Sequence, residues 1–368
     1  MEIIDRRLFL VKYGALFSVL PNMLAAEQVG NVCGFPVTDD RKLTFTDRPS
    51  RELRSFRIVS IEKHNSGSVL RISIHKHKNS EYFFSTDNGR SWQPDSSAMN
   101  GYENLNKYPS NGNAASNNAR TLFWQNSNLF RIVVSEDKGK SWRPIEIPSN
   151  IETRIGRILV ASVSPHDDNR LYVVIYYSTG RNEADYGVYQ VDSRTKTVIK
   201  IADNISYMVE SRANPKIVMG TTKFLRENIN YTEIVVSKDG GLTWNKIKED
   251  IVLNYYYIGE DAASMTRQSP SDRFSNLLNP IIQIESDPDD PDTFYVVMLN
   301  GVFVTHDLGE SFRILPIAHE YMHGIDEIAV NPVDGRHIFA AVKTKTSDLY
   351  HSDDRGCTWK KLELPTIS

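Results

Sequence analysis

One eight-residue pattern occurs five times in this chain and decides its fold. It reads STDNGRSW at residues 85–92, SEDKGKSW at 135–142, SKDGGLTW at 237–244, THDLGESF at 305–312 and SDDRGCTW at 352–359. Such spacing predicts a tight hairpin turn, because Asp accepts hydrogen bonds from turn amides and Gly readily adopts positive φ. We expect each turn to join two strands, with the final aromatic residue packed into the sheet.

The repeated side chains are therefore expected to be structural. They are Asp87, Asp137, Asp239, Asp307 and Asp354, with Trp92, Trp142, Trp244 and Trp359. One carboxylate per turn supplies too few ligands for calcium, so we expect no metal site here. We also expect no cofactor, and we do not assign these Asp residues as catalytic acids.

The spacing of the repeats predicts the architecture. The gap of 102 residues between Asp137 and Asp239 is about twice the gap of 50 between Asp87 and Asp137, so one repeat is missing. Residues 188–198, VYQVDSRTKTV, occupy its place. Each unit has apolar runs for four short strands, with the repeat between the third and fourth. We predict an all-β chain, a six-bladed β-propeller of four-stranded antiparallel blades, with seven blades as the alternative.

The five repeats resemble the Asp-box, or BNR, repeat of sialidases and other β-propellers, over roughly residues 55–365. Sialidases bind the substrate carboxylate with arginines and use a Tyr nucleophile assisted by Glu. The resemblance places Arg57, in the run Phe56-Arg57-Ile58-Val59, at the first arginine. It places Tyr321 at the nucleophile and Glu210 at its partner.

The rest of the sialidase catalytic set does not match. The loop that would carry the acid/base Asp reads His75-Lys-His-Lys78 and contains no carboxylate. Near the fourth-blade box Arg226 is present, but Thr232-Glu233 stand where a second arginine belongs. We therefore favour no catalytic residues, with Arg57, Glu210 and Tyr321 as the set for a sialidase-like alternative.

The N-terminus has the layout of a cleaved export signal. Arg6-Arg7 precede a short apolar stretch, and Ala25-Ala26 supply small residues for cleavage. The paired arginines resemble a twin-arginine signal, although Asp5 and Lys12 depart from that pattern. We divide the chain into a signal at 1–26, an N-terminal arm at 27–54 and a propeller at 55–368. The protein is predicted to be periplasmic or secreted, with no membrane span after cleavage.

Export changes the interpretation of the two cysteines, Cys33 and Cys357. In an oxidising compartment they are candidates for one disulfide joining the two ends of the chain. The loop-entropy model gives so long a loop roughly 4–5 kcal/mol of stabilisation, less any strain. Two unrelated thiols are the alternative.

Charge and loop composition point to a protein partner. Lys and Arg total 43 against 46 Asp and Glu, and this balance argues against nucleic acid. The loop at 251–280 is long, and Tyr and Arg commonly anchor interfaces. The candidate partner-binding residues are Tyr255, Tyr256, Tyr257, Glu260, Asp261, Arg267, Tyr176, Tyr177, Arg181, Arg226, His319 and His323.

The segment His319-Glu-Tyr-Met-His323 matches the zinc-protease pattern, which requires a helix. It lies between two short strands and between Pro316 and Gly324, so we interpret it as a loop. We predict an exported, non-catalytic propeller that binds a protein partner as a scaffold, an assembly factor or a periplasmic inhibitor such as an immunity protein. A sialidase-like exo-glycosidase or a glycan-binding propeller is the alternative.

Overall fold

The computed structural model describes residues 35–36, 55–64, 67–76, 79–95, 114–115, 122–126, 131–137, 141–145, 155–178, 184–226, 229–247, 277–278, 281–298, 301–317, 324–343 and 348–366. Within these ranges the regular elements are all strands. The chain divides into two compact units, residues 1–33 and 34–368, and every described residue belongs to the second. The prediction of an all-β chain is confirmed for the described residues.

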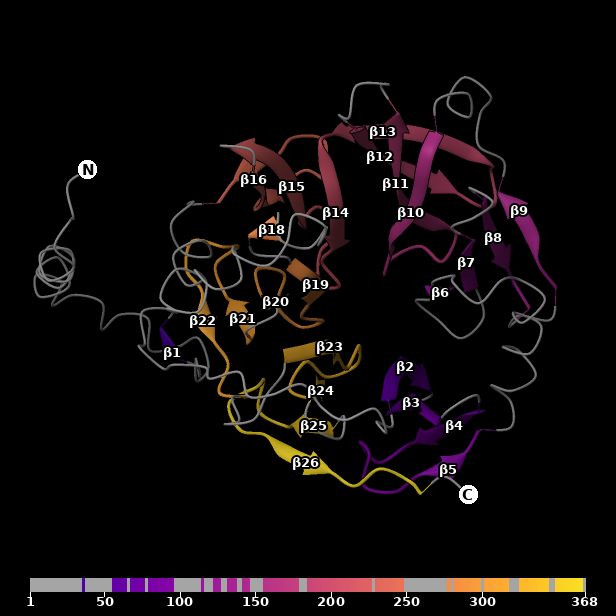
Figure 1. The fold of residues 1–368 in the computed structure, drawn as a ribbon, viewed down its shortest axis with the longest axis vertical. Coiled ribbons are helices and arrows are strands. Elements are labelled where there is room, and N and C mark those ends of the chain that lie inside the picture. The colour runs from indigo at the N-terminus through magenta and orange to yellow at the C-terminus, as the bar shows by residue number, and fades with distance from the viewer. Residues whose placement is uncertain are drawn as a thin grey trace, which may run out of the picture. The chain divides into compact units, whose positions relative to one another are not determined.

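The described strands form six sheets, each built on four antiparallel strands that are consecutive in the sequence (Figure 1). We number the sheets in chain order. The first contains β2 (Ser55–His64), β3 (Gly67–Lys76), β4 (Asn79–Ser85) and β5 (Gln93–Pro94). The second contains β6 (Ala114–Ala115), β7 (Leu122–Asn126), β8 (Arg131–Ser135) and β9 (Arg143–Ile145). The third contains β10 (Ile155–Val163), β11 (Arg170–Ser178), β12 (Ala184–Asp192) and β13 (Thr197–Asp203).

The remaining three sheets follow the same plan. The fourth contains β14 (Ile205–Glu210), β15 (Val218–Arg226), β16 (Ile229–Ser237) and β17 (Asn245–Lys246), with β18 (Leu277–Leu278) parallel to β16. The fifth contains β19 (Ile281–Ser286), β20 (Phe294–Met298), β21 (Gly301–Thr305) and β22 (Arg313–Ile314). The sixth contains β23 (Gly324–Val330), β24 (Ile338–Lys343), β25 (Asp348–Ser352) and β26 (Lys360–Leu362).

The hydrophobic core lies between neighbouring sheets. Successive side chains of a strand point to opposite faces, so one strand serves two interfaces. In β11, Leu171 and Val173 pack toward the second sheet, whereas Tyr172 and Val174 pack toward the fourth. This explains why strands such as β20, FYVVM, are apolar at every position and fully buried. Similar clusters join the fourth sheet to the fifth and the fifth to the sixth.

The first sheet also packs against the last. A hydrophobic cluster contains Leu70 and Ile72 of β3 together with Phe339 of β24. Polar contacts cross the same junction: the Asn331 amide donates to Ser68 Oγ at 2.7 Å, and the Trp92 indole donates to the Glu363 carbonyl at 3.0 Å. The described contacts therefore run from the second sheet through the sixth and on to the first.

The N-terminal arm supplies a strand that the sequence analysis does not predict. β1 (Phe35–Pro36) pairs antiparallel with β22 and adds a fifth strand to the outer edge of the fifth sheet. The pairing joins Phe35 to Ile314 and Pro36 to Arg313. The backbone of an outer strand can therefore accept an extended segment from elsewhere in the chain.

Candidate functional site

The five Asp boxes form hydrogen-bonded turns between the third and fourth strands of their sheets. In the fourth sheet Asp239 Oδ1 accepts from the Thr243 amide at 2.9 Å, and its Oδ2 accepts from the Thr243 hydroxyl at 2.5 Å. Ser237 Oγ donates to Asp239 at 2.7 Å and accepts from the Gly241 amide at 2.8 Å. Gly241 has a φ of 94°, which explains the glycine at this position.

Because of these hydrogen bonds, the box carboxylates have a structural role. Donation from Thr243, and then from Ser237, lowers the pKa of Asp239 to about 2. Equivalent serine or threonine contacts reach Asp87, Asp137, Asp307 and Asp354. A carboxylate held ionised in this way is a poor general acid at neutral pH.

The place of the missing box is occupied by an ordinary turn. β12 ends at Asp192 and β13 begins at Thr197, and Asp192 Oδ1 accepts from the amides of Arg194 and Thr195, both at 2.8 Å. Lys196 has a positive φ of 59°, close to the 56–60° of Asn88, Leu308 and Arg355, which precede the glycine in three of the boxes. The third sheet therefore keeps a side-chain-stapled turn although it has lost the box residues.

A second repeated turn joins the first and second strands of the third to sixth sheets. These turns begin at Ser164, Ser211, Asp287 and Asn331, and each of these side chains accepts from the amide two residues later, at 2.8 to 3.3 Å. An Asp or Asn three residues further on accepts in the same way, at 3.0 to 3.1 Å. In the sequence these loops had only their prolines as a signal, because Ser, Asp and Asn interchange at the bonding positions.

A polar pocket lies beside the first sheet, which lacks this turn. β2 ends at His64 and β3 begins at Gly67, where the later sheets have the longer turn. A pocket of 480 Å³ lies next to this short connection. It is lined by Gly67, Ser68, Thr86, Asn88, Asp289, Asn331, Val333, Asp334, Arg336 and His337, from the first, fifth and sixth sheets.

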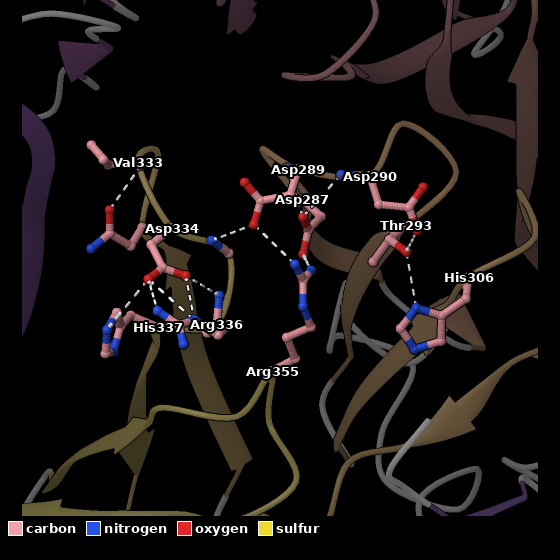
Figure 2. Close-up of polar contacts among 12 residues, drawn as sticks. Asp287, Asp289, Asp290, Thr293, His306, Val333, Asp334, Arg336, His337 and Arg355 are labelled. Carbon is pink, nitrogen blue, oxygen red and sulfur yellow. Dashed lines mark hydrogen bonds and ion pairs between the residues drawn. The ribbon is translucent and has the colours of Figure 1, made fainter. Parts of the chain in front are cut away.

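Two arginine–aspartate pairs set the charge around the pocket (Figure 2). Arg355, from the box of the sixth sheet, contacts buried Asp287 and donates to Asp289 at 2.9 Å. Asp289 also accepts from the Gly335 amide at 3.1 Å. Arg336 contacts Asp334 at 2.7 Å and lowers the pKa of Asp334 to about 2. The lining therefore carries both signs of charge, already paired.

A histidine pair lies at the pocket, where His337 is part of the lining. His337 Nδ1 and His351 Nε2 are 3.0 Å apart, and their rings stack with centroids 5.2 Å apart. His351 also stacks on Phe339, at 4.6 Å. Burial, together with the neighbouring His337, lowers the pKa of His351 to about 4. His351 is therefore neutral at pH 7, and one ring nitrogen of the pair donates to the other.

The structure separates two residues of the sialidase-like set. Arg57 lies near the start of β2, at the end of its sheet opposite the box. Glu210 is the last residue of β14, at the box end. Its side chain is 2% exposed; Oε2 accepts from the Tyr172 hydroxyl at 3.1 Å, and Oε1 has no hydrogen-bond partner among the described residues. Tyr321 lies outside the described residues.

Three predicted partner-binding residues lie in the described strands. Tyr176 and Tyr177 are near the end of β11, and Arg226 is the last residue of β15. Both strand ends are opposite the boxes. We call this side of the sheets, which carries the connections between second and third strands, the loop face. The others lie outside the described residues: Arg181, Tyr255, Tyr256, Tyr257, Glu260, Asp261, Arg267, His319 and His323.

Cys357 follows Gly356 in the box of the sixth sheet and is disulfide-bonded. Cys33 lies outside the described residues, so its role as the partner stays a prediction. No group of three or more potential metal-ligating side chains occurs in the described ranges. Nor do those ranges hold a helix with the length and apolar character needed to cross a membrane.

A family model for the BNR/Asp-box repeat matches residues 83–94, which contain the first box. The four other boxes share its spacing and its hydrogen bonds. The chain therefore carries Asp-box repeats. No curated protein matches the chain.

Several solved structures are similar at low identity. The GH74 xyloglucanase from Xanthomonas campestris is 14% identical, with a TM-score of 0.37, over 79% of this chain and 50% of that one. YCF48 from Cyanidioschyzon merolae is 11% identical, with a TM-score of 0.44, over 81% and 82%. TolB from Acinetobacter baumannii is 10% identical, with a TM-score of 0.45, over 82% and 78%. The chain spans about half the length of the xyloglucanase.

Proposed function

We propose that this protein is an exported, non-catalytic Asp-box β-propeller of six blades that binds a protein partner through its loop face. The observation that carries the proposal is the use of its carboxylates. Those of the Asp boxes and of the second repeated turn accept backbone and hydroxyl hydrogen bonds, and so serve to hold loops in place. A framework braced in this way suits a scaffold or an inhibitor that presents loops to another protein.

The order of packing supports six blades. Each sheet uses four consecutive strands, and the described clusters connect the second sheet through the sixth to the first. Contact between the first and last sheets is what closure of a propeller requires, because it covers the apolar faces at both ends of the series.

The burial of Glu210 supports a binding function over a sialidase-like hydrolytic one. A carboxylate that assists a nucleophile must face the substrate, whereas Glu210 is buried and contacts Tyr172 of the third sheet. Arg57 lies at the opposite end of its sheet. The glycan alternative would need an aromatic platform for a sugar. The described lining of the pocket contains no Trp, Tyr or Phe, and Tyr255, Tyr256 and Tyr257 lie outside the described residues.

Deletion of residues 254–275 tests the proposal. A pull-down with the intact protein from periplasmic and secreted extracts should recover one stoichiometric protein, and the deletion should abolish that recovery while the fold is retained. The matched control is Asn88→Ala with His337→Ala, which changes the pocket and leaves the loop face intact. Retained binding in the deletion variant, or loss of binding in the pocket variant alone, would contradict a loop-face site.

A further inference from the structure

The outer strand of the third sheet differs from the outer strands of the other sheets. β13 has seven residues, whereas β5, β9, β17, β22 and β26 have two or three. Among the described strands β13 pairs with β12 alone. An outer strand of this length presents a row of backbone amide and carbonyl groups that an added strand can pair with.

Apolar side chains are exposed beside this edge. Ile199, in the middle of β13, is 55% exposed, and Leu242, in the box of the fourth sheet, is 72% exposed. The two belong to adjoining segments, because a Cβ on Gly241 would meet Ile201 of β13 at 3.6 Å. Among the described strands the edge therefore combines an unpaired backbone with exposed apolar side chains, the two features that recognition by strand addition uses.

The fifth sheet shows that this architecture accepts such an addition. Its outer strand β22 pairs antiparallel with β1, an extended segment from a distant part of the chain. That edge offers only Arg313 and Ile314, whereas β13 offers residues 197–203. A longer run of backbone hydrogen bonds gives an added strand more affinity.

The charge of Lys200 determines which kind of added strand is favourable. It stands in the middle of β13 beside Ile199 and contacts Asp203 of its own strand. Two copies paired about this residue would bring their lysines together, and like charges directly opposite are unfavourable. A strand with an acidic residue opposite Lys200 and apolar residues on either side would instead match the charge and the margin.

We propose that the outer edge of β13 binds an extended segment of a protein partner, in which an acidic residue is flanked by apolar residues. The segment continues the third sheet by strand addition. This surface goes beyond the loop face of the proposed function, and the deletion of 254–275 removes none of its residues, so the two proposals are tested separately.

The test uses a synthetic peptide, acetyl-Thr-Thr-Val-Glu-Val-Thr-Thr-amide, and a control peptide with Lys in place of Glu. Binding to the full chain is measured by titration calorimetry, and hydrogen exchange locates the protected amides. We expect the Glu peptide to bind and to slow exchange at residues 197–203. Lys200→Glu should weaken the Glu peptide by about tenfold and should gain binding of the Lys peptide.

Two further variants complete the design. Lys361→Glu, on the outer strand β26, should leave binding unchanged. Ile199→Thr retains the strand preference and should weaken the Glu peptide through loss of the apolar contact. Failure of the Glu peptide to bind, protection elsewhere, or indifference to Lys200→Glu would overturn the proposal. Self-association of the protein that Ile199→Thr abolishes would also overturn it, because the edge would then serve a second copy.

Discussion

Each Asp-box carboxylate closes its turn from both sides. Asp354 accepts from the Ser352 hydroxyl before it and from the amide and hydroxyl of Thr358 after it, at 2.7, 2.8 and 2.7 Å. We expect Asp354→Ala to lower the free energy of unfolding by about 2 kcal/mol, because hydrogen bonds to a charged acceptor are lost together. The adjacent Asp353→Ala, which removes an exposed carboxylate, should cost under about 0.5 kcal/mol. Urea unfolding measures both, and equal losses would contradict the structural role of the box.

His351 makes stability depend on pH. Its pKa is about 4 in the folded protein and about 6.5 when unfolded, so the unfolded chain binds more protons between these values. Stability should therefore be complete above pH 6.5 and should fall as the pH drops toward 4, by about 3 kcal/mol at most. Burial also lowers the pKa of His306 and adds to this slope. His351→Gln should flatten the dependence measured by denaturation at pH 7 and 4.5, and an unchanged slope would show that other groups control it.

At the scale of the element, the turns between first and second strands hold neighbouring sheets together. Asp287, in the fifth sheet, has a side chain that is 0% exposed, and it pairs with Arg355 in the box of the sixth sheet. Arg355→Ala leaves this carboxylate buried without its charge partner, and we expect a loss of about 3 kcal/mol. Arg336→Ala breaks the more exposed pair with Asp334 and should cost under about 1 kcal/mol. Thermal unfolding of the two variants compares them directly, and similar costs would contradict the difference in burial.

The Trp92 contact links two sheets instead of closing its own turn. Trp244 and Trp359 donate to Gly241 and Gly356 of their own boxes, whereas Trp92 donates to Glu363 beyond the last strand. We expect Trp92→Phe to make residues 363–368 more sensitive to carboxypeptidase and to cost about 1 kcal/mol. Trp359→Phe is the matched control and should leave that sensitivity unchanged. Equal digestion of the two variants would show that the C-terminal segment does not depend on Trp92.

At the scale of the whole molecule, the predicted disulfide would tie the two ends of the chain. Cys357 lies in the box of the sixth sheet, and Gly356 of that box packs against Leu315. Leu315 directly follows β22, the strand that pairs with Phe35 and Pro36. We expect Cys33→Ser, Cys357→Ser and the double variant each to lower the free energy of unfolding by about 4 kcal/mol in oxidising buffer. Dithiothreitol should remove the difference from the unsubstituted protein. Additive losses in the double variant would exclude a shared bond.

The sequence by itself determined the hairpins and the strands. The box contacts span at most four residues, so they form wherever the pattern occurs, and the apolar runs follow from burial on both faces of each sheet. The second repeated turn is equally local. Its place is predicted by a polar segment with Pro between two apolar runs, but its hydrogen bonds are not, because Ser, Asp and Asn serve interchangeably as acceptors.

Only the tertiary structure decided the pocket and the contacts around it. Arg355 meets Asp287 across 68 positions, and Asn331 meets Ser68 across 263. Packing between sheets brings such residues together, and no local pattern encodes which partners will meet. The same packing placed Arg57 and Glu210 at opposite ends of their sheets and left β13 as a long outer strand. Residues close in sequence thus fixed the repeating unit, whereas contacts between sheets fixed where its surfaces can act.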